Sequence, residues 1–560
     1  MDMIWNIFFM FGGVAAMMLG MKIMGSSLEK VAGGSMKKML GKVTSNRFAG
    51  VGVGVAVTSI IQSSTATTVM LVGFVNIGLM TLNQATNVIM GANIGTTVTA
   101  HIVSLSGMGA VDIGAIASMI GCVGIFIAMF VKNDKVRNLG NILAGLGMIF
   151  VGLEFISTYA TKVMFVGGNK AEPYPFVISI FQQDHFPLLL ILIGICITAL
   201  VHSSSTITSL MVVLASIGVL PFGNAIYLAL GSNIGTCITS IMSSAGTNVN
   251  AKRTAFVHLM FNVLGCVIFI VPIWVWNTQV SQFFASISKD VGSQIAIFHT
   301  LFNLITTAVL LPFSTIIVRV ICKIIPDKKV VDEGLALKFI DNRLLETPPI
   351  AMDNTKKELV DMASTAKENL NIAIEMLIDS SVNKKETFVN NERRLNFLNA
   401  EITAFLTKIM GKEISKTDEI KIGTYYHVVS DLERIGDYAE NITEYTETLR
   451  EQNLDFSDEA KKELQDFIQS LNELFTISIS AFNERQFSLL PQVEELEDKI
   501  DDYTVELENY HIDRLKKGLC TAQIGSVYLQ TVSHLERIGD HITNVALSLR
   551  KYEDKSKSNA

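Results

Sequence analysis

Charged side chains are scarce in this chain of 560 residues, at 17% against 49% hydrophobic residues. The scarcity belongs to the first part of the sequence, since long apolar runs with few charges continue to about Lys323, whereas the sequence beyond about Asp327 is charged and poor in glycine. Long apolar runs are typical of membrane-spanning helices, and apolar residues at helical spacing are typical of soluble helices. We therefore predict an all-α protein in which a polytopic membrane domain precedes a soluble helical domain.

The sequence also lacks a clustered basic face and a CxxC pair. The formal net charge of −7 comes mainly from acids of the soluble half, which argues against a nucleic-acid partner. The six cysteines are scattered, so we expect neither a disulfide framework nor a zinc ribbon. The first apolar run, Ile4 to Leu19, has no basic n-region and no small-residue cleavage site. We expect it to be a retained membrane helix and not a signal peptide.

A short polar motif occurs twice inside apolar sequence. Its first part reads QSST at residues 62–65 and HSSS at 202–205, and its second part reads GANIGT at 91–96 and GSNIGT at 231–236. Both parts recur at an offset of 140 residues, and residues 57–100 align with 197–240 without a gap, 14 of 44 positions being identical. The membrane half is therefore internally duplicated.

The chemistry of this motif is unusual for a membrane segment, where irregular backbone is tolerated only against protein or a water-filled cavity. Ser, Thr and free carbonyls supply oxygens for a sodium ion that has lost its water. Hydroxyls, amides and the N-termini of broken helices supply hydrogen-bond donors for an oxyanion such as phosphate, and glycines let the backbone come close. Because the motif has no Arg or Lys, we hypothesise that co-bound cations balance the anion. The alternative is that these small residues only allow close helix packing.

The layout of the membrane half follows from its interruptions. The apolar stretch 48–80 is too long for one spanning helix and is polar at its middle, which predicts a re-entrant hairpin followed by a spanning helix. Basic residues at Lys132–Arg137 and Lys252–Arg253 are expected in cytoplasmic loops. We assign a transmembrane domain to residues 1–325, repeats within it to about 48–105 and 188–243, a linker to 326–350, and a cytoplasmic helical domain of one or two bundles to 351–555.

A smaller repeat places His258 with Asn262, and His299 with Asn303, each pair four residues apart on one helix face. Such pairs are typical of polar contacts that hold membrane helices together. The alternative is that they support or gate the site.

The soluble half is duplicated too, since LERIGD at residues 432–437 recurs at 535–540. Glu433 and Asp437 lie four residues apart on one helix face, as do Glu536 and Asp540. Stacked carboxylates repel unless a cation lies between them, so a metal ion or an Arg is expected there. Upstream helices offer further polar partners at similar spacing. The alternative to a metal site is a solvated helix face whose carboxylates pair with arginines of the same helix. The upstream partners are Glu392 with Asn396 and Glu497 with Asp501; the arginines are Arg434 and Arg537.

The duplicated membrane motif resembles the signature of the type II sodium/phosphate cotransporter family, whose members carry it in two inverted repeats with re-entrant hairpins. The resemblance implies that the motif residues surround phosphate and sodium. The residues so assigned are Gln62, Ser63, Ser64, Thr65, Asn93, Thr96, His202, Ser203, Ser204, Ser205, Asn233 and Thr236. His202 stands where the second copy usually has Gln, so transport is expected to depend on pH. Electrogenic members carry an Asp shortly after the first GxNIGT helix, where this chain has only Asp112 nearby, and the resemblance leans toward electroneutral coupling.

The soluble half resembles PhoU, a helical-bundle regulator of phosphate uptake whose repeated acidic motifs bind transition metals. This resemblance implies a divalent or transition metal at Glu433, Asp437, Glu536 and Asp540. We predict sodium-coupled transport of inorganic phosphate across the plasma membrane, regulated by the cytoplasmic domain, in a chain that can form a homodimer. A phosphate exporter or channel, and a phosphate-status signalling protein, remain as alternatives. Enzyme chemistry is not expected, because Ser203 beside His202 has no oriented acid and no Gly-x-Ser-x-Gly elbow.

Overall fold

The structure, a computed structural model, describes residues 2–41, 46–105, 113–168, 170, 172–183, 186–326, 335–412, 414 and 416–551, and of residues 33–41, 113, 346, 416 and 417 the backbone only. Every regular element in these residues is a helix, apart from one isolated bridge between Phe165 and Pro173. The all-α prediction is confirmed. The chain forms two compact units, residues 1–330 and 331–560. Asp112 lies outside the described residues.

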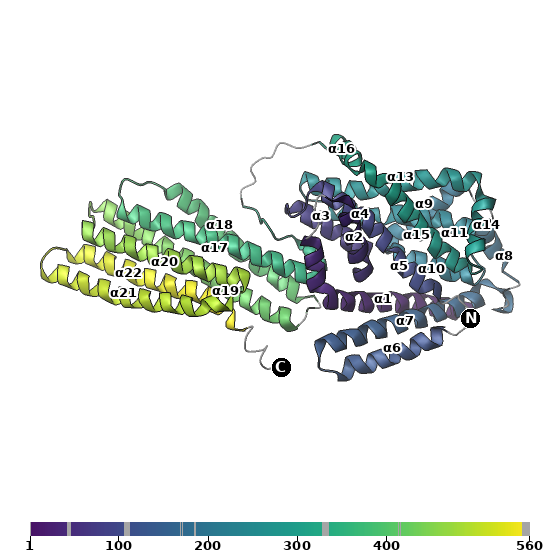
Figure 1. Ribbon diagram of the computed structural model, residues 1–560, viewed down its shortest axis with the longest axis horizontal. Coiled ribbons are helices and arrows are strands. Elements are labelled where there is room, and N and C mark those ends of the chain that lie inside the picture. Colours follow the sequence, from purple (N-terminus) through teal and green to yellow (C-terminus); the bar gives the residue numbers. More distant parts are fainter. Residues whose placement is uncertain are drawn as a thin grey trace. The chain divides into compact units, whose positions relative to one another are not determined.

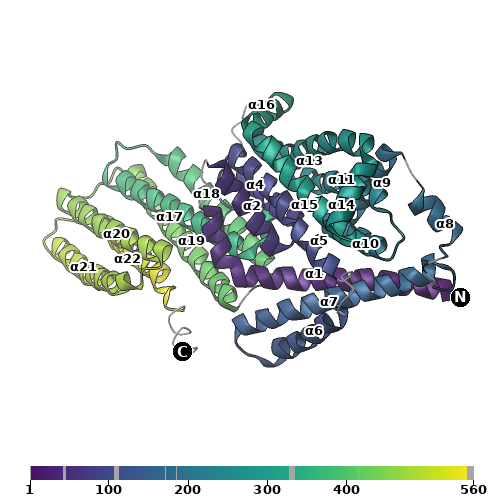
Figure 2. The same ribbon diagram turned by 45° about the vertical axis from the view of Figure 1, so that its right-hand side comes forward.

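The first unit contains sixteen α-helices and three short helical segments in its described residues (Figure 1). They are α1 (Asp2–Gly41), α2 (Arg47–Ile61), α3 (Ser64–Asn76), α4 (Leu82–Gly95), α5 (Thr97–Ser104), α6 (Ile113–Phe130), α7 (Asp134–Met164), η2 (Val166–Gly168), α8 (Pro175–Val177), η3 (Ile178–Gln182), α9 (Pro187–Val201), α10 (Ser204–Ser216), α11 (Phe222–Gly235), α12 (Cys237–Ser243), α13 (Val249–Val275), α14 (Asn277–Ile287), α15 (Val291–Leu310), η4 (Leu311–Phe313) and α16 (Ser314–Ile324). Helices α1, α7 and α6 lie side by side in both ribbon views (Figures 1 and 2).

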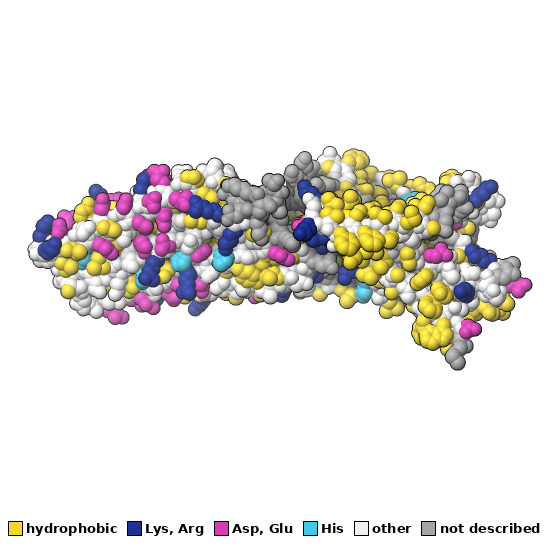
Figure 3. Space-filling view, turned by 90° about the horizontal axis from the view of Figure 1, so that it is seen from below, with side chains coloured by type: hydrophobic (Ala, Val, Ile, Leu, Met, Phe, Trp, Pro, Cys, Tyr) yellow, Lys and Arg dark blue, Asp and Glu magenta, His cyan; other side chains and the backbone are white. Residues whose placement is uncertain are grey.

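Several helices of this unit are long and apolar enough to cross a membrane. Among the described residues there are five such runs, or six if the bent pair Pro175–Gln182 and Pro187–Val201 is one span. The five are Asp2–Ala32, Asp134–Met164, Phe222–Ser243, Val249–Val275 and Val291–Ile324. Large apolar side chains are exposed on the outside of the unit, for example Phe130 at 73% and Leu200 at 81% (Figure 3). A soluble monomer rarely exposes so much apolar surface, whereas a lipid-facing surface requires it.

Both copies of the polar motif break their helix in the same way. Gln62 ends α2 in the left-handed region, at φ 58° and ψ 23°, and His202 ends α9 at φ 59° and ψ 21°. A side chain at positive φ is strained unless its surroundings hold it there. Only two other non-glycine residues in the described part of the chain have positive φ. The predicted interruption of the apolar stretch therefore falls at Gln62, and it divides that stretch into two helices of 15 and 13 residues.

The motif glycines serve the packing of helices. A Cβ atom on Gly91 of α4 would lie 2.0 Å from the carbonyl oxygen of Val51 in α2. The second copy repeats this contact, since a Cβ atom on Gly231 of α11 would lie 2.0 Å from the carbonyl oxygen of Ile191 in α9. These positions therefore require glycine for close approach of two helices.

The described residues of the second unit form six long helices in two groups of three. The first group is α17 (Pro348–Ile378), α18 (Lys385–Met410) and α19 (Lys416–Glu451), preceded by η5 (Asn342–Glu346); the second is α20 (Asp458–Glu484), η6 (Phe487–Leu489), α21 (Leu490–Lys516) and α22 (Ala522–Leu547). Contacts of α17 with α20 and of α19 with α22 join the groups. Each acidic LERIGD motif lies on the last helix of its group, and α18 or α21 packs beside it. The surface of this unit carries many charged side chains (Figure 3).

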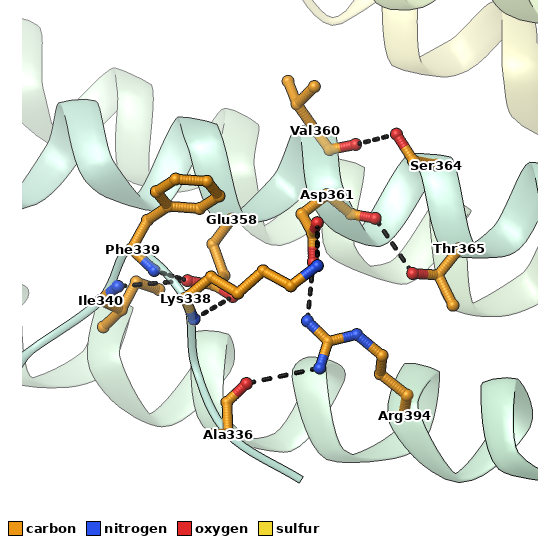
Figure 4. Close-up of polar contacts among 10 residues, drawn as sticks. All are labelled: Ala336, Lys338, Phe339, Ile340, Glu358, Val360, Asp361, Ser364, Thr365 and Arg394. Carbon is orange, nitrogen blue, oxygen red and sulfur yellow. Dashed lines mark hydrogen bonds and ion pairs between the residues drawn. The ribbon is translucent and has the colours of Figure 1, made fainter. Parts of the chain in front are cut away.

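Part of the predicted linker is bound to this unit (Figure 4). The buried carboxylate of Glu358 on α17 accepts hydrogen bonds from the backbone N–H groups of Lys338, Phe339 and Ile340, at 3.0, 2.6 and 3.1 Å. Asp361, one turn further along α17, pairs with Lys338 and with Arg394 of α18. The segment 338–340 is therefore fixed to α17, and α17 itself begins at Pro348, inside the range predicted as linker.

Candidate functional site

The first serine of each motif caps a helix that begins inside the membrane unit. Ser63 Oγ accepts a hydrogen bond from Ala66 N at 3.1 Å at the start of α3, and Ser203 Oγ accepts one from Thr206 N at 3.2 Å at the start of α10. The first N–H groups of a helix have no partner within the helix, and the helix dipole makes that end favourable for an anion. Both copies therefore present a helix N-terminus at the motif.

The second serine of each motif has a free hydroxyl. Ser64 and Ser204 are the first residues of α3 and α10, only 6% and 4% exposed. Neither hydroxyl makes a hydrogen bond with a residue that the structure describes, whereas the neighbouring Ser63 and Ser203 are occupied as caps. These two hydroxyls are therefore available to water or to a ligand.

The residue at each break is tied to the helix that follows GxNIGT. Thr99 Oγ1 donates to Gln62 Oε1 at 2.8 Å, and Thr239 Oγ1 lies 3.0 Å from His202 Nδ1. The two threonines are 140 residues apart, as are Gln62 and His202. His202 is exposed, whereas Gln62 is partly buried. The side chains of both left-handed residues are therefore held in equivalent positions.

The asparagines and threonines of GxNIGT differ between the copies. In the first copy, Asn93 Nδ2 donates to Ile89 O at 3.0 Å and Thr96 Oγ1 to Ala92 O at 3.0 Å, so both side chains bond to their own helix. In the second copy, Thr236 Oγ1 donates to the carbonyl oxygen of Asn233 at 2.6 Å. Asn233 is 5% exposed, and its Nδ2 has no partner among the described residues.

The two copies are packed crosswise. Helix α3 of the first copy packs against α12 of the second, and α10 of the second packs against α5 of the first. Thr68 Oγ1 and Ser240 Oγ, 2.8 Å apart, form a buried hydrogen bond across one of these contacts. No hydrogen bond joins the segment 62–65 directly to the segment 202–205 in the described residues. The structure thus connects the copies through the helices that follow the motifs.

Two buried histidines contact the second copy. His258 Nδ1 of α13 lies 3.1 Å from Ser240 Oγ, and His299 Nε2 of α15 lies 3.1 Å from Asn233 Oδ1. Both histidines are 1% exposed, and His258 Nε2 and His299 Nδ1 have no partner among the described residues. These contacts fit both sequence interpretations, because they join helices through polar side chains and one of them reaches Asn233 of the second motif.

Some residues of this network were missed by sequence reasoning. The sequence analysis did not single out Thr68, Thr99, Thr239 and Ser240. The first three stand at positions that are identical when residues 57–100 are aligned with 197–240. Identity between the copies is the signal that could have found them. Other buried polar atoms of the unit also lack partners among the described residues, and they mark a polar interior: Ser209 Oγ, Asn262 Oδ1, Asn303 Oδ1 and Thr306 Oγ1.

The second unit brings acidic residues together at both LERIGD motifs. One carboxylate oxygen each from Glu497 and Asp501 of α21 and Asp540 of α22 lie within 4.8 Å of one another. Burial, followed by the Asp501 and Asp540 carboxylates, raises the pKa of Glu497. Three carboxylate oxygens from two helices, so close to one another, fit a divalent metal. Glu536, predicted as a ligand, is not a member of this group.

The first acidic motif is arranged differently. Burial, together with the carboxylates of Glu440, Asp437 and Glu433, raises the pKa of Glu392 on α18 to about 7. Asn369 and Asn396 donate to Glu392 at 3.4 and 3.1 Å. Asp437 pairs with Arg434 at 3.5 Å, the intrahelical alternative that the sequence left open.

Comparison with protein families divides the chain between residues 309 and 359, where the two compact units also meet in sequence. Residues 16–158 and 180–309 match the family described as Na+/Pi-cotransporter, and residues 359–446 and 464–549 match the PhoU domain twice. No solved structure matches the chain.

Individual relatives align with different shares of the chain. The "Putative inorganic phosphate export protein YjbB" of Escherichia coli strain K12 is 22% identical over 546 residues, which is 97% of either chain. The uncharacterized protein YqeW of Bacillus subtilis is 30% identical over 309 residues, 55% of this chain and 95% of YqeW. Human sodium-dependent phosphate transport protein 2B is 34% identical over 138 residues, 24% of this chain and 20% of the human protein.

Proposed function

The chain belongs to the Na+/Pi-cotransporter family and carries two PhoU domains, and from this premise we propose that it carries inorganic phosphate across the plasma membrane. Phosphate binds between the two copies of the duplicated motif, which form inverted repeats. The observation that supports this site best is the pair of largely buried serines, Ser64 and Ser204, whose hydroxyls make no hydrogen bond with a described residue, each at the first turn of a helix that begins inside the membrane unit. Hydroxyl donors and helix N-termini are what an oxyanion requires in a place without Arg or Lys.

We propose that net transport is outward. The relatives that align over almost the full length, PhoU domains included, carry a name that refers to phosphate export. The human protein named for sodium-dependent phosphate transport aligns over only 24% of this chain. The alternative that the sequence left open, an exporter, is therefore preferred here over uptake.

Sodium is proposed as the coupling ion. The motif offers hydroxyl and carbonyl oxygens but no cationic side chain, so a phosphate ion in it needs co-bound positive charge. The remaining motif residues, Gln62, Thr65, His202 and Ser205, are hydrogen-bond donors or acceptors at the same two helix breaks. They complete the coordination of phosphate and sodium.

The PhoU unit is proposed to regulate transport from the cytoplasmic side, with a divalent metal held by Glu497, Asp501 and Asp540. Elemental analysis of the purified protein tests the metal. Metal is expected in the wild type and reduced in Asp540→Ala, whereas Asp513→Ala, an acidic residue of α21 outside the group, should retain it. Equal metal content in all three proteins would contradict the assignment.

Transport is tested with radiolabelled phosphate in proteoliposomes, with and without a sodium gradient. Ser64→Ala and Ser204→Ala each remove one hydrogen bond to a charged ligand, so we expect flux at limiting phosphate to fall about tenfold or more. Ser104→Ala is the matched control, because Ser104 is also buried but its hydroxyl bonds to the carbonyl oxygen of His101. Wild-type flux in both motif variants would contradict the proposed site.

A further inference from the structure

The soluble unit contains a cavity that is separate from the acidic motifs. It has a volume of about 180 Å³ and lies between the start of α20, the end of α21 and the start of α22. Its polar lining includes Ser457, His511, Arg514 and Thr521, and its apolar lining includes Phe456 and Ile524. None of the acidic residues assigned to the metal lines it.

Arg514 presents a free donor in this cavity. Its Nη1 pairs with Glu463 at 2.7 Å, and its guanidinium lies 5.0 Å from the ring centroid of Tyr528. The hydroxyl of Tyr528 donates to the other oxygen of Glu463. Arg514 is therefore locked in place, yet its Nη2 is buried without a partner among the described residues, in a side chain that is 8% exposed. A fixed guanidinium with a spare N–H group is well suited to bind an oxyanion.

His511 is a second lining residue with a side-chain atom that has no partner. It is 1% exposed and stacks on Tyr528 with ring centroids 5.2 Å apart. Its Nε2 has no partner in the described part of the chain. Gly525 leaves the room for this ring, because a Cβ atom there would lie 2.4 Å from Nε2. When the ring carries its hydrogen on Nε2, it offers a second buried donor.

Two helix N-termini complete the lining. Ser457 caps α20 through Ala460 N, and Thr521 caps α22 through Ile524 N. The helices are 27 and 26 residues long, so each brings a full positive dipole end to the cavity. Two carboxylates near the cavity are paired: Asp455, which lines it, bonds to Lys461 at 2.6 Å, and Glu463 bonds to Arg514. The first turn of α20 also carries Asp458 and Glu459, which do not line the cavity.

We propose that this cavity binds a small oxyanion of the phosphate class, either free phosphate or the phosphoryl group of a small ester, through Arg514 Nη2, His511 Nε2 and the N-terminal turns of α20 and α22. Two residues that line the cavity each carry a buried donor atom without a partner, and two helix N-termini lie at the cavity. Buried donors of this kind are expected to be satisfied in the functional state. The aromatic and apolar lining leaves room for the carbon part of an ester. The site lies in the soluble unit, and binding there does not depend on transport.

Cys520 lines the cavity and provides a local reporter, because it is the only cysteine beyond residue 322. The rate at which N-ethylmaleimide alkylates Cys520 is measured by peptide mass spectrometry on the full-length protein in detergent. Inorganic phosphate and glycerol 3-phosphate are titrated in separate series against chloride at equal ionic strength. Only unoccupied protein reacts, so a ligand at about ten times its dissociation constant should slow alkylation about tenfold.

Two variants place the effect in the cavity. Ser457→Asp keeps a good helix cap but adds negative charge beside the anion, and we expect protection of Cys520 to be lost. Thr448→Asp makes a similar change on an exposed position of α19 outside the cavity, and protection should remain. Circular dichroism at rising temperature verifies that both variants are folded.

The outcomes separate the sources and the sites. Protection by inorganic phosphate assigns the site to the free ion, and protection by the ester alone assigns it to a phosphorylated metabolite; both support the proposal. Lack of protection by either compound overturns it. Protection that persists in Ser457→Asp, or that disappears in Ser204→Ala of the membrane unit, also overturns it, because the ligand would then act elsewhere. Failure of phosphate transport alone leaves the alkylation result unaffected.

Discussion

Glu358 holds the segment 338–340 on the first helix of the soluble unit, and this contact gives a prediction whose size follows from the structure. Its carboxylate accepts three backbone N–H groups, one on Oε1 and two on Oε2. A hydrogen bond to a charged group contributes about 1.5–3 kcal/mol. In Glu358→Ala both acceptor oxygens and all three hydrogen bonds are lost, so we expect the amides of residues 338–340 to lose about 2 kcal/mol of protection each. This corresponds to exchange that is about 30-fold faster.

Glu358→Gln should give a graded result. Its amide provides only one acceptor oxygen, which can serve the two N–H groups that now bond to Oε2. The Lys338 amide then faces an NH₂ group and should exchange nearly as fast as in the alanine variant, while Phe339 and Ile340 should change less. Hydrogen exchange with mass spectrometry on the full-length protein, with residue-level fragmentation, measures all three amides.

Asp361→Asn is the control for this experiment. It leaves Glu358 unchanged but removes the ion pairs to Lys338 and Arg394. Lys338 is 53% exposed, and an exposed ion pair contributes about 0–1 kcal/mol, so exchange of the three amides should rise less than in Glu358→Ala. Unchanged exchange in Glu358→Ala would refute the reasoning, because it would mean that the carboxylate does not hold this segment.

Three further predictions concern the motif, the helix packing and the acidic cluster. His202→Gln should flatten the dependence of phosphate flux on pH, and an unchanged profile would remove His202 from the mechanism. Gly231→Ala places a methyl group 2.0 Å from a carbonyl oxygen of α9 and should lower the melting temperature in detergent by several degrees, whereas Gly223→Ala on the same helix, with its nearest atom at 3.6 Å, should not. Glu392→Gln should stabilise the metal-free protein more at about pH 8 than at about pH 4.5. The pKa of Glu392 is raised from 4.5 to about 7 in the folded state, so the folded state holds a proton that the unfolded state has released, and stability is lost as pH rises from about 4.5 to about 7. Equal effects at both pH values in thermal unfolding would contradict that last account.

The sequence was informative where a residue pattern has a single structural solution. Apolar runs predicted membrane helices, and the polar interruption at Gln62 coincides with the observed break, because hydroxyls and an amide cannot continue a lipid-facing helix at no cost. The pairing of Glu392 and Glu497 with the LERIGD motifs was anticipated from helical spacing. Spacing could not predict that the two motifs differ. Asp437 pairs with Arg434 of its own helix, whereas Asp540 lies close to Glu497 and Asp501 of the neighbouring helix.

Contacts between the two copies were also beyond the sequence. The hydrogen bond from Thr68 to Ser240 joins residues 172 positions apart, and no periodicity within one copy indicates which helix of the other copy it meets. The role of the motif glycines was understood only in part. They were expected to let backbone come close, and the structure shows that Gly91 and Gly231 do so between helices of the same copy.

The central claim is that this protein moves phosphate outward through the site that contains Ser64 and Ser204. The most direct measurement is the loss of radiolabelled phosphate from preloaded cells that express the wild type, Ser204→Ala or the control Ser104→Ala at equal membrane abundance. We predict rapid loss with the wild type and the control, and loss at the background rate with Ser204→Ala. Net accumulation of external phosphate by the wild type, or equal loss from cells with all three proteins, would contradict the account.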